Sequence, residues 1–361
     1  MQDHRKHWWL LAGVLVVTFT LLGFFGREVY RQAPPIPDRV VTESGQTVMT
    51  QDDILAGQQV WQSTGGQQLG SIWGHGAYQA PDWSADWLHR EASTLLDLWA
   101  AERGAASFEA LSATEQGALQ ARLKEEMRRN TYDPDSGVLT ISEDRREALT
   151  RVAAHYDALF GGSGELDGLR ESYAMRDVTI PDAGRRDDLT SFFFWTSWAC
   201  ATERPGSDVT YTNNWPHEAL IGNVPTGANL LWSIISVVLL LAGIGALAWW
   251  MAFRGGDEPR AVPDAKDPMT RLELTPSMRA VGKFLAVVVG VFGLQVLLGA
   301  LTAHYTVEGQ SFFGLPVGEW LPYSLTRTWH IQSGIFWIAT AFLAAGLFLA
   351  PAVGGREPRF Q

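Results

Sequence analysis

Four long apolar runs, none of which contains Asp, Glu, Lys or Arg, divide the chain. They cover residues 8–26, 229–253, 284–303 and 331–355. Each run is long enough to cross the roughly 30 Å hydrocarbon core of a membrane as an α-helix. Aromatic residues gather near the ends of the runs, as they do at membrane interfaces. The pattern therefore predicts four membrane spans.

The first run has a second interpretation, as the apolar part of a cleaved signal peptide. It is longer than the apolar region of most signal peptides, and no Ala-x-Ala cleavage site follows it. We therefore favour a transmembrane anchor helix, residues 1–26, that is retained in the protein.

The positive charges beside these runs predict how the chain crosses the membrane. If every run crosses, one side receives most of the flanking cations: Arg5, Lys6, Arg254, Arg260, Lys266, Arg271, Arg279, Lys283, Arg356 and Arg359. The turn between the last two runs carries only Arg327. Because cytoplasmic loops are enriched in Lys and Arg, we expect the N terminus in the cytoplasm. Residues 27–226 and the turn between the last two runs then lie outside.

The outer segment, residues 27–226, is long enough to form a domain with its own core. Helical patterns cover residues 84–106, 112–130 and 142–160, and an earlier helix begins around Asp52 and Asp53 and ends near residues 65–66. A short strand is expected at residues 138–141, after a turn at residues 132–137. The prolines of residues 34–37 favour an extended spacer. We expect a mostly helical domain.

The expected helix at residues 112–130 has the clearest local signals. Ser112 and Glu115 have the spacing of a capping box. Leu119, Leu123 and Met127 repeat every four residues among charged positions, which is typical of a helix with one buried face.

Three further local sequences stand out, at residues 74–83, 192–198 and 211–218. The second is Phe-Phe-Phe-Trp-Thr-Ser-Trp, which we interpret as an aromatic belt at the membrane interface. In the first, Gly76 permits close approach of the backbone to a neighbour, and Tyr78 offers a hydroxyl oxygen.

Composition argues against nucleic acid as a partner and excludes a c-type haem. The 361 residues have a formal net charge of −11, and an acidic chain rarely offers the basic face that nucleic acids require. Cys200 is the only cysteine, so the chain has no disulfide and no Cys-x-x-Cys-His site for covalent haem.

Ionisable residues at the adjoining ends of the last two runs indicate chemistry at the membrane margin, where charges are costly. His304, Glu308 and Phe312 have helical spacing and could share a face, although Gly309 disfavours a continuous helix there. A redox ligand that gives up protons needs a hydrogen-bonding partner, a group that takes its protons and an apolar wall, and this trio offers all three. The alternative is an interfacial histidine beside a solvated glutamate.

His330 follows Trp329 and precedes the fourth apolar run. A neutral imidazole there could bind haem iron if a neighbouring acceptor oriented its second nitrogen. By itself, a histidine at a helix end is more often structural than a metal ligand.

Residues 74–83, 211–223, 304–312 and 327–330 match, in order, patterns of a known family. Through them the chain from Val41 onward resembles the quinol-dependent nitric oxide reductases, single-chain relatives of the haem-copper oxidases. The resemblance implies a mainly α-helical membrane protein. It has an anchor helix, then a periplasmic domain of cytochrome c-like fold without haem c at residues 27–226. The catalytic bundle begins at residues 227–361, with spans at about 229–253, 284–303 and 331–355.

The resemblance also implies roles for single residues. His304, Glu308 and Phe312 would bind quinol, and His330 would be an axial ligand of the low-spin haem b. Arg327 would contact the haem propionates, which suits a guanidinium. Gly76 and Tyr78 would give oxygen ligands to a calcium ion. Its carboxylate partner in the family lies on a later helix, which this sequence does not contain.

The family reaction requires more ligands than the chain offers. Its centre combines a high-spin haem b with a non-haem iron and needs several further histidines. Of the eight histidines, only His304 and His330 fall at the membrane bundle. We therefore expect a catalytically incomplete fragment, with the high-spin haem and non-haem iron held by missing C-terminal helices or by a separate chain.

Two hypotheses follow. In the first, the chain is part of an enzyme of denitrification in the bacterial inner membrane, which uses quinol to reduce nitric oxide to nitrous oxide. Its partners would then be lipid, quinol, nitric oxide and the missing helices. In the second, the chain is a truncated, non-catalytic membrane protein that at most binds quinol.

Overall fold

The computed structural model describes residues 5–254, 272–308, 314–354 and 356–357. The expected site residue Phe312 lies outside this part of the chain. The fold is mainly helical, and four of the helices in the described residues are long and apolar enough to cross a membrane. They are α1 (Arg5–Arg31), α8 (Gly227–Arg254), α10 (Gly282–Glu308) and α12 (Tyr323–Gly354). The prediction of four apolar spans is confirmed.

Helices α10 and α12 extend beyond the apolar runs that predicted them. Helix α12 begins at Tyr323, so Arg327 and His330 lie inside its first turns instead of before the span. A polar residue near the end of a spanning helix can reach the interface while the backbone stays helical. An uncharged run in the sequence therefore predicts the apolar middle of each spanning helix but not the residues at which the helix begins and ends.

The segment between α1 and α8 alternates short strands with helices. Its elements are β1 (Arg39–Thr42), β2 (Thr47–Thr50), α2 (Gln51–Ser63), α3 (Trp83–Glu102), α4 (Ala113–Arg128), β3 (Tyr132–Asp133), β4 (Val138–Ile141), α5 (Glu143–Gly161), α6 (Asp167–Ser172) and α7 (Ala183–Ala201). The strand at residues 138–141 and the capping box of α4 are confirmed. Helix α3 ends at Glu102, before the predicted end, and Gly104 follows with a positive φ.

The described residues form a four-stranded sheet, of which the sequence predicted only the strand at residues 138–141. Its strand order is β2-β1-β4-β3, with β1 parallel to β4 and the other two pairs antiparallel. Strands β1 and β2 have four residues each, too few for alternation to stand out from the surrounding chain. Strand β1 finds its parallel partner in β4, far along the sequence.

Contacts divide the chain into two compact units. Unit 1 comprises Met1–Gly57, Ser84–Ala153 and Asp188–Pro225. Its core includes the predicted stripe of α4, where Leu119, Leu123 and Met127 are fully buried. Trp87 and Trp99 of α3 are also inside. Burial of this apolar surface removes it from water and so stabilises the unit. The chain has a single cysteine, so no disulfide within the chain adds to this.

The aromatic run at residues 192–198 is buried in unit 1, so its interpretation as an interfacial belt is wrong. These residues belong to the second half of α7, and every side chain from Leu189 to Ala201 is buried. The Trp195 indole donates to the Pro35 carbonyl over 2.9 Å, and Trp198 packs against Tyr211. A helix that is apolar all round fits a protein core as well as a membrane, and only packing decides between them.

A buried ion pair crosses the core of unit 1. Nε of Arg145 donates to Glu91 over 2.6 Å, and the Trp87 indole donates to the other Glu91 oxygen over 3.0 Å. Both charged side chains are at most 3% exposed. Their mutual pairing and the indole hydrogen bond offset part of the cost of removing them from water, although Nη2 of Arg145 is buried without a hydrogen-bond partner in the described part of the chain.

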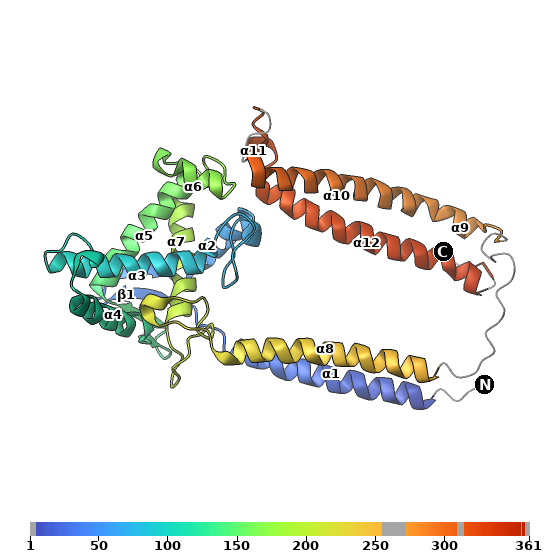
Figure 1. The fold of residues 1–361 in the computed structure, drawn as a ribbon, viewed down its shortest axis with the longest axis horizontal. Helices are drawn as coiled ribbons and strands as arrows, with labels where there is room; N and C mark the ends of the chain where they lie inside the picture. The colour runs from blue at the N-terminus through green and yellow to red at the C-terminus, as the bar shows by residue number, and fades with distance from the viewer. Residues whose placement is uncertain (1–4, 255–271, 309–313, 355, 358–361) are drawn as a thin grey trace. The chain divides into compact units, whose positions relative to one another are not determined.

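Unit 2 comprises Gln58–Trp83, Ala154–Asp187 and Thr226–Gln361. One cluster centres on the buried Trp83, whose ring meets Tyr156, Phe160 and Tyr173 edge-on. The long helices α10 and α12 pack along each other as an antiparallel pair, with the short helix α11 (Val317–Trp320) at one end (Figure 1).

Candidate functional site

The end of the α10–α12 pair beside α11 is fixed by two tyrosines. The Tyr305 hydroxyl donates to the Leu321 carbonyl, and the Tyr305 and Tyr323 rings meet edge-on with centroids 5.8 Å apart. Ala174 packs in the same cluster. Arg176 adds hydrogen bonds to two carbonyls of α11. The helix ends that carry the predicted site residues are therefore held together.

His330 is half-buried on α12 and faces α10. Its Nδ1 lies 2.9 Å from the backbone carbonyl oxygen of Gln295. Because a carbonyl oxygen only accepts, Nδ1 carries a proton, and in the neutral form of the ring the lone pair is then on Nε2. Within the described residues Nε2 makes no hydrogen bond. A histidine that ligates a metal ordinarily donates its other N–H to such an acceptor, so this geometry fits an axial haem ligand.

Arg327 and Tyr78 lie together, although they are far apart in the sequence. The Arg327 guanidinium carbon is 5.2 Å from the centroid of the Tyr78 ring, a cation–π distance. Tyr78 is 65% exposed, so its side chain remains accessible. The structure thus brings the residue expected at the haem propionates next to one expected at calcium.

Gly76 lies in a loop closed by a buried carboxylate. Asp82 accepts hydrogen bonds from the Ser71 hydroxyl over 2.7 Å and from the Gly74 N–H over 2.6 Å. The Gly76 N–H donates to the same Ser71 hydroxyl over 2.8 Å. Gly76 has φ +90°, which a side chain would disfavour. The loop therefore holds Tyr78 on a defined backbone.

Within the described ranges, no three His, Cys, Asp or Glu side chains come together as a group that could hold a metal ion. Gly76 and Tyr78 would contribute only neutral oxygen atoms, and Ca²⁺ sites normally add carboxylates. The calcium site stays a prediction.

His304 and Glu308 both belong to α10, which runs to Glu308. The helix therefore continues through both residues, and their four-residue spacing places them on one face. The side chain of Glu308 and all of Phe312 lie outside the described part of the chain. The quinol site as a whole stays a prediction.

A cavity of about 520 Å³ in unit 2 lies on a different face of α12. Ser324, Leu325 and Thr328 line it, whereas Arg327 and His330 do not. Arg327 and His330, three residues apart, share another face of the helix. The cavity is therefore not the place where His330 would meet a haem.

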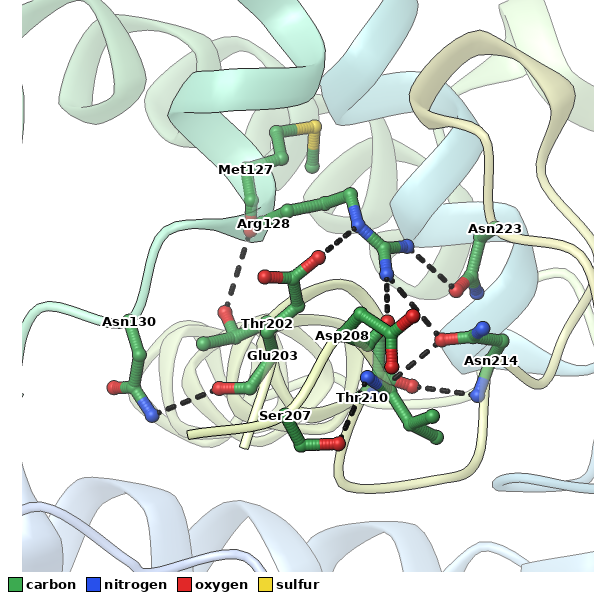
Figure 2. Close-up of polar contacts among 11 residues, drawn as sticks. Met127, Arg128, Asn130, Thr202, Glu203, Ser207, Asp208, Thr210, Asn214 and Asn223 are labelled. Carbon is green, nitrogen blue, oxygen red and sulfur yellow. Dashed lines mark hydrogen bonds and ion pairs between the residues drawn. The ribbon is translucent and has the colours of Figure 1, made fainter. Parts of the chain in front are cut away.

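Unit 1 holds a polar network that sequence reasoning missed (Figure 2). Its centre is Arg128, the last residue of α4, whose side chain is 8% exposed. The guanidinium donates to Glu203 over 2.8 Å, to the Asp208 carbonyl over 2.7 Å and to Asn223 over 3.4 Å. Asn214, at 3.5 Å, completes the set. Arg128 therefore fixes the loop between α7 and α8.

The network explains the unusual sequence at residues 211–223. Asn213 and Asn214 both have positive φ, a conformation that asparagine tolerates better than most residues. The Asn214 side-chain oxygen accepts from the Thr210 backbone N–H over 3.0 Å, and the Asn214 backbone N–H donates to the Thr210 hydroxyl over 2.8 Å. The Asn-Asn pair was the available signal in the sequence, but nothing in it pointed to Arg128.

These features define a class of membrane protein. A helical domain lies between apolar helices in the sequence, and Nδ1 of one histidine is hydrogen-bonded to a carbonyl oxygen, as in metal-binding histidines. Comparison with family models is more specific. Residues 37–217 match the model of the NorB cytochrome c-like domain of nitric oxide reductase. The match covers half of the chain, which therefore belongs to the NorB family of nitric oxide reductases. Comparison with curated proteins gives no match.

Proposed function

We propose that this chain takes part in quinol-dependent reduction of nitric oxide, supplying the quinol site and one ligand of a low-spin haem b. Family membership supports the reaction, in which two NO, two electrons and two protons give nitrous oxide and water. The observation that carries the haem assignment is the hydrogen bond from Nδ1 of His330 to the Gln295 carbonyl, which leaves Nε2 available for iron.

Haem b, when bound, supplies one-electron transfer. His330 would hold its iron through Nε2. The guanidinium of Arg327 is a planar fork of N–H donors and suits the carboxylates of the propionates. Its contact with Tyr78 supports this role, because it gives the guanidinium a defined location.

At the quinol site, His304 and Glu308 would accept hydrogen bonds from the quinol hydroxyls. Oxidation of a quinol to a quinone releases two protons and two electrons, and an imidazole and a carboxylate can take the protons. Phe312 would form an apolar wall for the ring. The placement of His304 and Glu308 one turn apart on α10 supports this pairing.

In this proposal, α10 and α12 do not hold the catalytic dinuclear centre. Six of the eight histidines fall outside α10 and α12, which leaves His304 and His330. Further helices, or a separate chain, would hold the high-spin haem b and the non-haem iron. Gly76 and Tyr78 would join a calcium ion only with a carboxylate from that part.

The proposed location is the bacterial inner membrane, with the N terminus in the cytoplasm and residues 27–226 in the periplasm. The apolar helices and the family support a membrane protein, and the unequal distribution of Lys and Arg supports the orientation.

The test compares haem content and haem reduction in membranes that contain the full chain. Wild-type protein is expected to show the absorption of a b-type haem, and His330→Ala to lose it. His89→Gln, which alters a largely exposed histidine of unit 1, is the matched control. Added hydroquinone is expected to reduce the wild-type haem but not that of His304→Ala or Glu308→Gln. Retention of haem by His330→Ala would refute the ligand assignment.

The second candidate is a non-catalytic membrane protein that at most binds quinol. The two histidines on α10 and α12 are fewer than a haem and iron centre needs, which favours this candidate over an enzyme complete in itself. Purified chain that consumed nitric oxide with hydroquinone as donor would contradict both this candidate and the proposed division of ligands.

A further inference from the structure

The His330 ring lies directly on the backbone of α10. A Cβ atom added to Gly299 would stand 2.7 Å from Cε1 of His330 and 2.9 Å from its Nδ1. These distances are shorter than real Cβ contacts, so even alanine would force the ring or the helix to move. Glycine at this position is therefore a condition for the observed ring placement.

The hydrogen bond that orients the ring comes from the same face of α10. Gln295 lies one turn before Gly299, and its carbonyl oxygen accepts from Nδ1 over 2.9 Å. The two residues do different things: Gly299 lets the imidazole approach, and Gln295 fixes which nitrogen carries the proton.

The Gln295 side chain is itself held by α12. Its Oε1 accepts from the Trp337 indole over 2.6 Å. On the same helix, a Cβ at Gly334 would stand 2.9 Å from Nε2 of Gln295. His330, Gly334 and Trp337 are spaced by four and three residues and share one face of α12. A glycine on each helix therefore admits a large side chain of the other, as small residues do in packed membrane helices.

We propose that Gly299 and Gln295 form a seat for His330, and that they are positioning residues for the haem iron ligand. This inference rests on the proposed haem-binding role of His330. The seat fixes the ring plane and keeps the lone pair on Nε2. Replacing a residue that supports a metal ligand in this way typically changes metal affinity about 10- to 100-fold.

The first experiment uses Gly299→Ala in the full chain, with Gly293→Ala as the matched control. Both glycines lie in α10, but nothing stands within 4 Å of a Cβ at Gly293. Gly299→Ala is expected to weaken haem b binding about tenfold or more and to shift the midpoint potential of the haem that remains. Gly293→Ala is expected to match the wild type in both. Wild-type affinity and potential in Gly299→Ala would overturn the inference.

A second measurement separates this inference from the proposed function. Nitrogen NMR of the ¹⁵N-histidine-labelled chain without haem reports which His330 nitrogen carries the proton, with His330→Ala used for assignment. The wild type and Gly293→Ala are expected to show protonated Nδ1, and Gly299→Ala to lose this preference. If His330→Ala retained haem, the proposed haem role of His330 would be refuted, but the seat would not. If Gly299→Ala kept the wild-type tautomer, the seat would be refuted.

Discussion

Arg128 shows how one residue can hold a long loop. It lies at the end of α4, and its buried guanidinium reaches a carboxylate, a carbonyl and two side-chain amides of the segment between α7 and α8. That segment has little regular structure, so its polar groups need partners outside helices and sheets. The charge-assisted hydrogen bonds of one arginine supply several of them.

Replacing Arg128 with alanine is expected to destabilise the protein by roughly 2–3 kcal/mol. Glu203 is about a third exposed, and water would partly replace the lost ion pair. The Asp208 carbonyl and the two asparagine side chains would lose a donor. Chemical unfolding of the full chain in detergent, followed by tryptophan fluorescence, measures this change.

The matched control is Arg151→Ala. Arg151 pairs with Glu147 on α5, and both side chains are largely exposed. Exposed pairs contribute about 0–1 kcal/mol, so a small effect is expected. Equal losses in both variants would show that Arg128 does not organise the loop.

At the scale of elements, the crossing of α2 and α7 depends on a glycine. A Cβ at Gly57 would stand 2.0 Å from the Asp188 carbonyl oxygen and 2.7 Å from Cβ of Phe192. Backbone atoms cannot move aside as the end of a long side chain can. The buried half of α7 is therefore placed by close contact between two helix backbones.

Gly57→Ala is expected to destabilise the protein by about 1–3 kcal/mol or more, as overpacking does. Gly117→Ala on α4 is the control, because nothing lies within 4 Å of its Cβ. Alanine is the better helix former there by about 1 kcal/mol. Thermal unfolding should therefore move in opposite directions for the two variants, and an undiminished stability of Gly57→Ala would contradict the close crossing.

At the scale of the whole molecule, several carboxylates outside the membrane helices have lowered pKa values: Glu109, Glu115, Asp133, Glu143 and Glu357. Hydrogen bonds favour the charged form in each. For Glu143 the largest cause is the Ser44 hydroxyl, which donates over 2.7 Å and holds the pKa below its usual 4.5. Such groups bind protons more readily when the protein is unfolded, so they make stability rise with pH.

The stability contribution of Glu143 is expected to be complete well above pH 4.5 and to be lost as the pH falls through the lowered pKa. Ser44→Ala should weaken this pH dependence. Ser207→Ala is the control, since its hydroxyl accepts from the Val209 N–H instead of donating to a carboxylate. Urea unfolding at a series of pH values from neutral downward checks this, and a full wild-type slope in Ser44→Ala would count against it.

The proposed orientation makes a prediction for the whole chain. The single native cysteine, Cys200, is buried, so Cys200→Ala gives a background for labelling. In that background Asp135→Cys is expected to react with a membrane-impermeant maleimide from the periplasmic side, and Ala265→Cys only after the membrane is opened. The reverse pattern would contradict the positive-inside assignment.

Local signals in the sequence were enough for several parts of the fold. The apolar runs predicted four membrane helices, and the capping box with its apolar stripe predicted α4, because these features depend on residues within a few turns of each other. The start of α12 and the strand β1 could not be predicted as well. Strand β1 depends on a partner that is distant in the sequence.

The candidate site, like the fold, could be predicted from the sequence only in part. The sequence by itself determined that two histidines, a glutamate and an arginine fall at the ends of two apolar helices, and its motifs indicated the family. Tertiary structure alone decided that the aromatic run of α7 is a protein core, that Arg128 holds a distant loop and that Arg327 meets Tyr78. Periodicity and side-chain chemistry are local properties of a chain, whereas burial and partners depend on which surfaces pack together.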